Sequence, residues 1–145
     1  MCSQKLIVII NQTTEEVATL DQEIASVDDL VTLLFALIPS EKMEGSIPKI
    51  HRAFFRTMKQ FPGILDYLLF DTNGHMPVSD RLDEIIRRFK LSGLITFTYT
   101  LCPKMTMRQG IKDKVRKADE ASVRQRVPQL DEMVEFLSQQ LVTAS

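Results

Sequence analysis

The sequence is short of several residue types on which particular functions depend. Of its 145 residues two are cysteine, two are histidine, five are glycine and none is tryptophan. Cys2 and Cys102 lie far apart, without a further cysteine or histidine at metal-ligand spacing, which argues against a zinc site and a disulfide framework. The glycines are isolated from one another, so no loop of the phosphate-cradling type is present. No window approaches the ~20 apolar residues of a membrane span. We expect a cytoplasmic protein with no cofactor, no metal and no membrane partner.

Residues suited to catalysis are equally scarce. His51 is expected to be partly exposed on a basic helix and His75 to lie in a loop, and neither has a serine or cysteine at a spacing that suggests an activated nucleophile. Asp80, Asp83 and Glu84 fall in the first turns of one helix, where a favourable interaction with the helix dipole accounts for them. We therefore expect no catalytic residues and no enzymatic activity.

The overall charge of the chain is close to zero, but its distribution is uneven. With 44% hydrophobic and 26% charged residues, the composition is that of an ordinary globular domain. The formal net charge is −1, yet the segment 87–117 holds nine basic residues against a single acidic residue, Asp113. This segment predicts a local basic face on a protein that is neutral as a whole.

Hydrophobic periodicity, caps and turn residues predict a mainly helical chain. Ser26 is expected to cap a helix that stops at Pro39, a polar connector over 39–45 follows, and Pro48 occupies the first turn of the next helix. The expected elements, in order, are a strand at 6–10, helices at 27–38, 47–61, 64–70 and 79–92, strands at 94–101 and 105–109, and helices at 111–121 and 128–142.

The middle of this order is typical of a winged helix-turn-helix. A short helix at 64–70, a turn at Asn73-Gly74, an amphipathic helix capped by Ser79 and a β-hairpin after Gly93 follow one another, and the capped helix would be the recognition helix. We therefore expect a mainly α fold with a small β-hairpin, a winged helix-turn-helix-like domain with additional N-terminal and C-terminal helices. The winged-helix-like domain with its N-terminal extension would span residues 1–126, and a C-terminal amphipathic helix would span 127–145.

The basic segment covers the elements that would contact a DNA duplex in such a domain, namely the end of the recognition helix, the hairpin and the next helix. The candidate DNA-binding residues are Arg87, Arg88, Lys90, Lys104, Arg108, Lys112 and Lys114. Two alternatives stay open, since Lys112, Lys114, Arg116 and Lys117 can also solvate one exposed helix or dock an acidic patch on a partner protein. The carboxylates of Asp80, Asp83 and Glu84 on the same recognition helix would repel phosphate.

The C-terminal helix carries an apolar stripe that something must cover. The residues of this stripe are Leu130, Met133, Val134, Leu137 and Leu141. An amphipathic helix can offer such anchors to a groove on a partner or on a second copy of the chain, and it can equally pack back onto its own core. The sequence leaves both alternatives open, and with them the question of a homodimer.

Four stretches together resemble a known family. They are Phe61-Pro62-Gly63-Ile64-Leu65-Asp66-Tyr67, Asp71-Thr72-Asn73-Gly74, Leu82-Asp83-Glu84-Ile85-Ile86 and Ser92-Gly93-Leu94-Ile95. Over about residues 27–100 the chain is similar to the small winged-helix middle components of bacterial ABC-type three-component and Lamassu-like SMC-associated defence systems. The resemblance implies a non-catalytic accessory subunit of an anti-phage or anti-plasmid complex, which bridges an SMC-like ATPase subunit and an effector nuclease subunit and contacts double-stranded DNA through the complex. The alternative is a stand-alone winged-helix DNA-binding transcriptional regulator that reads two half-sites as a dimer.

Overall fold

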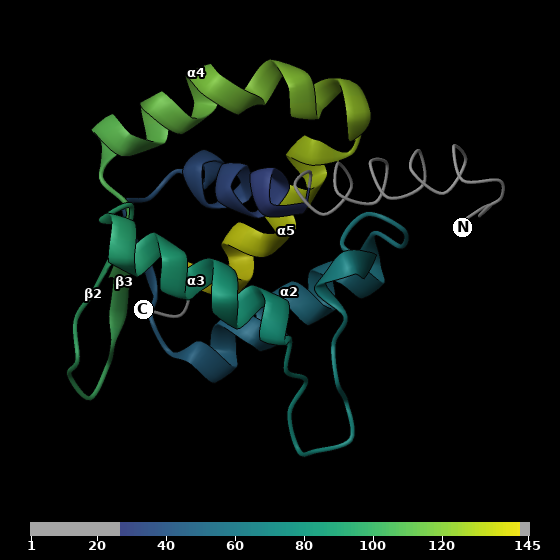
Figure 1. The fold of residues 1–145 in the computed structure, drawn as a ribbon, viewed down its shortest axis with the longest axis vertical. Helices are drawn as coiled ribbons and strands as arrows, with labels where there is room; N and C mark the ends of the chain where they lie inside the picture. Colours follow the sequence, from purple (N-terminus) through teal and green to yellow (C-terminus); the bar gives the residue numbers. More distant parts are fainter. Residues whose placement is uncertain (1–26, 143–145) are drawn as a thin grey trace, which may run out of the picture.

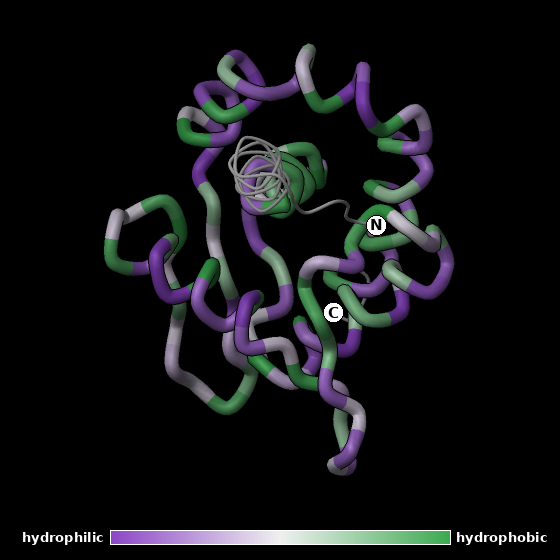
Figure 2. The backbone as a smooth tube through the Cα atoms, turned by 45° about the vertical axis from the view of Figure 1, so that its right-hand side comes forward, coloured by the Kyte–Doolittle hydropathy of each residue, from purple (hydrophilic) through white to green (hydrophobic). Residues whose placement is uncertain are grey.

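The centre of the fold is a helix over residues 27–37, within the residues 27–142 that the computed structural model describes. Its apolar side chains occupy most of the circumference of the helix and most of them are buried, and Val31, Leu33, Leu34 and Phe35 are fully inaccessible to solvent. A helix that is hydrophobic on most sides must be covered on those sides, whereas Asp29 on its remaining side is exposed. Figure 2 shows this central helix enclosed by the rest of the chain. The expected strand at 6–10 and the expected cap at Ser26 lie outside the described residues.

A small antiparallel sheet of three strands, in the order β1-β3-β2, lies beside the helices. β1 spans Lys42–Glu44, β2 spans Thr96–Phe97 and β3 spans Lys104–Thr106. The β2–β3 hairpin was predicted, but both strands are shorter than expected. The prediction of a polar connector over residues 39–45 was wrong, because this segment contains β1. A strand of three residues with two charges has no alternating pattern that a sequence could reveal, and β1 forms because its backbone pairs with β3.

Gly45 is the position at which the chain leaves β1 and passes close to the start of β3. Its amide donates to the carbonyl oxygen of Pro103 at 2.9 Å. A Cβ at this position would lie 2.7 Å from three backbone atoms of Pro103 and Lys104. Backbone atoms cannot rotate out of the way as a side chain can, so this contact admits only glycine.

Two helices of the core, α2 (Ile47–Gln60) and α3 (Asp80–Ser92), agree with the predicted boundaries, but the segment between them does not. The helix expected at 64–70 is a single 3₁₀ turn, η1, over Asp66–Leu68. The residue after it, Leu69, has a left-handed φ of 57°, which no α-helix continues through. A short apolar run is compatible with a buried turn as well as with a buried helix. The sequence therefore could not predict that residues 64–70 form only one 3₁₀ turn.

The last two helices complete the core around the central helix. α4 spans Gln109–Arg126 and passes across the side of the central helix opposite α3, and α5 spans Leu130–Leu141 and packs against α2 (Figure 1). α5 belongs to the same continuous hydrophobic core as the central helix, α2 and α3. The expected boundary at residue 126 is therefore not a boundary of the core.

Candidate functional site

α3 is the helix that the sequence predicts to be the recognition helix. Local contacts define both of its ends. The hydroxyl of Ser79 accepts a hydrogen bond from the Leu82 amide at 3.0 Å and donates one to the carbonyl oxygen of Leu68. The helix ends at Gly93, whose φ of 81° is in the left-handed region that glycine adopts without strain. The predicted Ser79 cap and the predicted stop at Gly93 are confirmed.

The ring of His51, on α2, joins α2 to the start of α3. Its Nδ1 accepts a hydrogen bond from the backbone amide of Ser79 at 3.0 Å, and its Nε2 donates to Asp83 Oδ1 at 2.7 Å. Because Nδ1 is an acceptor in this arrangement, the proton of the neutral ring is carried by Nε2. His51 is only 2% exposed, so the expectation of a partly exposed histidine was wrong.

The contact of a histidine with a serine and an aspartate does not create a nucleophile and its base. The hydroxyl of Ser79 is buried and hydrogen-bonds to backbone groups, whereas His51 contacts the Ser79 amide instead of the hydroxyl. Nucleophilic catalysis needs a hydroxyl within reach of both the base and the substrate. This cluster stabilises the junction between α2 and α3.

The outward side of α3 carries four exposed residues, here called the α3 row, which are Asp80, Glu84, Arg87 and Leu91. The core-facing residues of the same helix are Leu82, Ile85, Ile86 and Phe89, as predicted. At 3.6 residues per turn, the α3 row lies on the opposite side of the helix from these four residues. The row therefore points away from the core, and Leu91 in it is 81% exposed.

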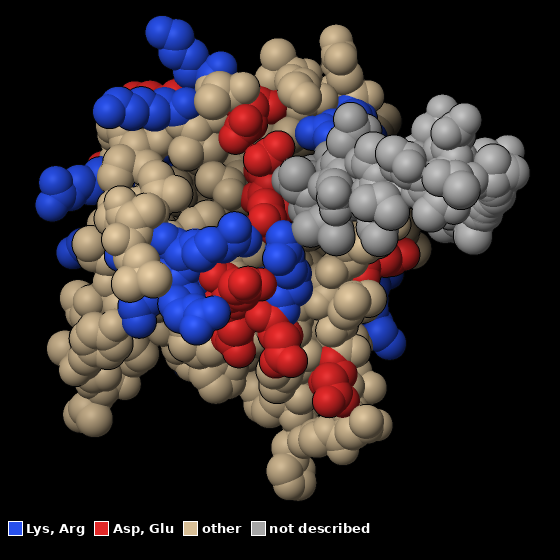
Figure 3. Space-filling view, in the orientation of Figure 1, with Lys and Arg blue, Asp and Glu red and all other residues tan. Residues whose placement is uncertain are grey.

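Charged residues beside the α3 row have partners within the chain. Asp28, on the central helix, pairs with Arg81 at 2.7 Å and with Arg88 at 2.8 Å. Arg81 also reaches Glu84 at 3.3 Å. Figure 3 shows basic and acidic side chains intermingled over α3, without a continuous basic patch. A phosphate backbone laid along this helix would meet charges of both signs.

The C-terminal end of α3 is joined to the β2–β3 hairpin through Lys90. The ammonium of Lys90 lies 5.1 Å from the centroid of the Phe97 ring and 5.4 Å from that of Tyr99, which is cation–π geometry. Beyond Phe97 the expected alternation of buried and exposed residues fails, since Tyr99 is 78% exposed and Leu101 is fully exposed. The tip of the hairpin is thus an uncovered apolar projection next to α3.

Lys112 is unavailable to DNA, and its assignment to the DNA-binding residues was wrong. The side chain is 1% exposed, and its Nζ donates to the carbonyl oxygens of Phe35 and Ile38, each at 2.8 Å. These carbonyls end the central helix, where the last turn has no intrahelical donors. Burial lowers the pKa of Lys112 from 10.5 to about 8, against a smaller opposing effect of Glu41. Lys112 therefore caps a helix.

The other basic candidates are divided among three elements. Arg87 is in the α3 row, Lys104 is half-buried in β3, and Arg108 and Lys114 are exposed at the start of α4 and on its first turns. Arg88 and Lys90 are held by Asp28 and by the two aromatic rings, respectively. Apart from the buried Lys112, four of the seven predicted residues thus remain without an ion pair or a cation–π contact in the described part of the chain, and they do not form one row.

The apolar stripe of α5 packs inward. Leu130, Met133 and Leu137 are fully buried and Leu141 is 2% exposed, and Val134 is half-buried beside them. Of the two alternatives that the sequence left open, the structure shows packing onto the chain's own core, so these residues are not free to anchor a partner. An amphipathic pattern alone does not reveal what covers it.

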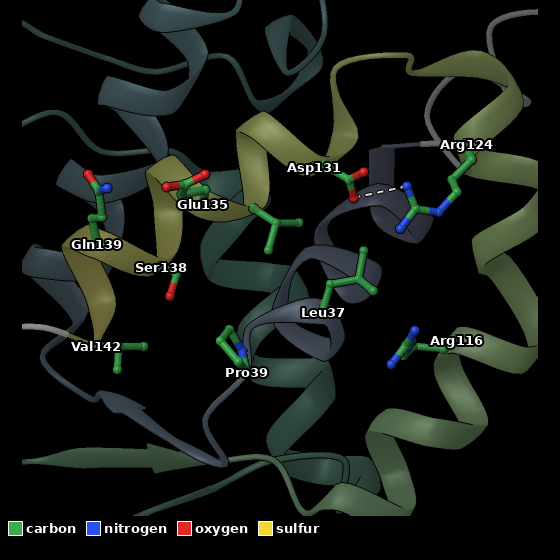
Figure 4. A pocket seen from close by; sticks show the side chains of 10 residues that line it. Leu37, Pro39, Arg116, Arg124, Asp131, Glu135, Ser138, Gln139 and Val142 are labelled. Carbon is green, nitrogen blue, oxygen red and sulfur yellow. Dashed lines mark hydrogen bonds and ion pairs between the residues drawn. The ribbon is translucent and has the colours of Figure 1, made fainter.

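A cleft of about 490 Å³ lies between the end of the central helix, α4 and α5. Leu37 and Pro39 line one side of it, Arg116 and Arg124 line it from α4, and Asp131, which pairs with Arg124, and Glu135 line it from α5 (Figure 4). Outside the cleft lining, Glu120 accepts hydrogen bonds from both arginines, which lowers the pKa of its carboxyl. Arg124 also pairs with Asp131 at 2.9 Å, and this ion pair connects α4 to α5.

Comparison with known proteins identifies no relative. No family model, no curated protein and no solved structure matches the chain. Function must therefore be inferred from the surfaces themselves.

Two kinds of feature are absent from the described residues, a cluster of metal ligands and a helix that could cross a membrane. They contain no group of three or more histidine, cysteine or acidic residues that could hold a metal ion. None of their helices is long and apolar enough to cross a membrane. The α3 row, with the hairpin tip beside it, is the surface on which the sequence placed a binding function. Sequence patterns could have found the row, because its residues lie on the side of α3 opposite the core-facing residues.

Proposed function

We propose that this chain is a non-catalytic winged-helix subunit that acts by docking other protein chains through α3 and the adjacent hairpin. The order of elements supports the winged-helix assignment, since a helix, a strand, two helices and a hairpin follow one another and the early strand pairs with the hairpin in the order β1-β3-β2. Such a domain normally presents its third helix and its hairpin to a partner.

The observation that favours a protein over a DNA duplex is the charge of the α3 row. A helix that reads the major groove contacts base edges with its N-terminal residues. In α3 this half carries Asp80 and Glu84, together with Asp83 beside them, and carboxylates there oppose the approach of phosphates. A protein surface can match charges of both signs.

The resemblance noted above suggests which chains would be docked, namely an SMC-like ATPase and an effector nuclease of a defence complex. The exposed residues Arg87, Arg108 and Lys114 favour the alternative, a stand-alone DNA-binding regulator, because they are free of ion pairs in the described region. The two functions differ in whether the chain acts alone.

The test is to co-express the tagged chain with the products of the neighbouring open reading frames and, separately, to titrate the purified chain with duplex DNA. We expect large subunits to co-purify and the chain alone to bind duplex weakly and without sequence preference. Tight binding of a specific duplex by the chain alone would overturn the proposal. In that case the double variant K104E/R108E should reduce the salt dependence, by about one unit of slope for each lost phosphate contact.

A further inference from the structure

The α3 row is complementary to itself when two copies of the helix run antiparallel. In order along the helix, the row reads acidic, acidic, basic, apolar, at Asp80, Glu84, Arg87 and Leu91. A two-fold axis passing between Glu84 and Arg87 places each Glu84 opposite the Arg87 of the other copy. The same axis places each Leu91 opposite the start of α3 in the other copy.

The helix dipole does not account for the two charges at the centre of this row. Its effect is confined to the first and last turns of a helix, and the first turn of α3 (Asp80–Ser92) holds Asp80 and Asp83 but not Glu84, for which the dipole was expected to account. Arg87 likewise lies in the middle of the helix. Within the described residues Glu84 contacts only Arg81, at 3.3 Å, and Arg87 has no ion pair. The outward charge of Arg87 is therefore available to a partner.

Apolar side chains are exposed at both ends of α3. Leu91 is 81% exposed near the C-terminal end, and Val78, two residues before the helix, is 42% exposed. Antiparallel packing brings the C-terminal end of one helix against the N-terminal end of the other, and the axis between Glu84 and Arg87 places Leu91 of one copy opposite Asp80 of the second, two residues after Val78. These contacts extend the buried area beyond the two central ion pairs.

We propose that α3 pairs with the α3 of a second copy of this chain, in an antiparallel two-fold contact centred on reciprocal Glu84–Arg87 ion pairs. The inference rests on the proposed function, because it names the partner of a surface there assigned to protein docking. A two-fold contact of this kind uses the same patch on both copies. A single helix of 13 residues is about 20 Å long, which is short for an interface. The dimer is accordingly weak and sensitive to salt, since exposed ion pairs are screened.

The experiment measures the molar mass of the full chain in solution by sedimentation or light scattering, at salt concentrations of about 50 mM and about 500 mM. The wild-type chain should form dimers at low salt that dissociate at high salt. E84R and R87E each place like charges opposite one another and should weaken dimerisation roughly tenfold or more. A chain that stays monomeric at low salt over the whole accessible concentration range would overturn the inference.

Mixing the two single variants gives the sharper result. In a mixed dimer, the two arginines of E84R face the two glutamates of R87E, so a tagged E84R should capture R87E although neither variant pairs with itself. The double variant E84R/R87E should dimerise like the wild type. All these positions are exposed, so thermal unfolding should show that each variant is folded. K117E, a charge reversal at an exposed position of α4, serves as the control and should dimerise normally.

Failure of this inference is distinguishable from failure of the proposed function. If the wild type dimerises but the single variants do so equally well, or if the mixture recovers nothing, α3 is not the contact between copies. If in addition E84R abolishes co-purification with the larger subunits, α3 docks a different protein and the proposed function stands while the second copy is excluded. If neither dimerisation nor co-purification depends on Glu84 and Arg87, both proposals are wrong.

Discussion

At the scale of single residues, two buried polar side chains, Lys112 and His51, each hydrogen-bond to a helix terminus. Lys112 supplies donors to the last carbonyls of the central helix, and His51 supplies an acceptor to the amide of Ser79. Each side chain reaches a helix terminus whose backbone groups would otherwise be buried without partners, which is costly. Neither role can be inferred from the sequence, because each contact joins positions far apart in the chain and a lysine or histidine on a helix is more often exposed.

The buried ammonium of Lys112 makes the stability of the protein depend on pH in the alkaline range. Its pKa in the folded state is about 8 against 10.5 for the free side chain, so between these values the unfolded state binds more protons. The free energy of unfolding should therefore rise with pH from about 8 to about 10.5, by at most about 1.4 kcal/mol per pH unit. The neutral amine keeps two N–H donors for the two carbonyl oxygens.

Urea unfolding at several pH values measures this slope, and K112M should remove the part that Lys112 contributes. K114M changes an exposed lysine of the same helix and should leave the slope as in the wild type. A wild-type slope equal to that of K112M would show that Lys112 titrates normally.

The two hydrogen bonds of His51 should contribute unequally to stability. H51F keeps an aromatic ring against Phe70 but leaves the buried Ser79 amide without an acceptor, at a cost of about 1–3 kcal/mol. D83N weakens only the bond at the other nitrogen, where the Asp83 side chain is 50% exposed, and should cost less than about 1 kcal/mol. Denaturant unfolding of both variants tests this order, and a larger loss in D83N than in H51F would reverse the assignment.

At the scale of elements, the helices that could be predicted are those whose capping residues and apolar periodicity lie within one short stretch of sequence. α3 has an N-cap, a core-facing side and a C-terminal glycine, and its boundaries agree with the expectation, as do those of α2 with its Pro48. β1 and η1 were not predicted because contacts with distant segments stabilise each of them. β1 pairs with β3, and the carbonyl oxygen of Leu68 in η1 accepts a hydrogen bond from the Ser79 hydroxyl. In the candidate site, the exposed charged residues of α3 could be predicted from the sequence. The ion pair between Arg88 and Asp28 could not.

The packing of α5 makes its stripe a determinant of folding. Leu137 is fully buried, so L137A should cost about 2–5 kcal/mol through lost apolar contacts and a residual cavity. E135A, at an exposed position of the same helix, should change stability by less than about 0.5 kcal/mol. Reversible unfolding of the isolated chain gives both values. If L137A unfolded like the wild type, α5 would not be part of the core.

At the scale of the whole molecule, one hydrophobic core joins elements from both ends of the described chain. It includes Val27, the first described residue of the central helix, and Leu141 at the end of α5. Ion pairs also connect separate elements. They join the central helix to α3 and α4 to α5. We therefore expect the described region to unfold as one cooperative unit.

Removal of residues 127–145 should abolish this cooperative transition, although the sequence suggested a boundary at residue 126. The shortened chain loses four buried side chains, Leu130, Met133, Leu137 and Leu141, and leaves their counterparts on α2 uncovered. Circular dichroism with thermal unfolding detects the loss. A shortened chain that melts at the temperature of the full chain would show that α5 is dispensable.

The burial of most of the central helix also has a consequence for synthesis. Residues 27–37 are made early, while α4 and α5, which cover part of this helix, end at residues 126 and 141. At roughly 5–20 residues per second, about five to twenty seconds pass on the ribosome before its last covering helix exists. During that interval the most apolar segment of the described chain is without its final neighbours. The protein should therefore depend on chaperones during translation more than its small size suggests.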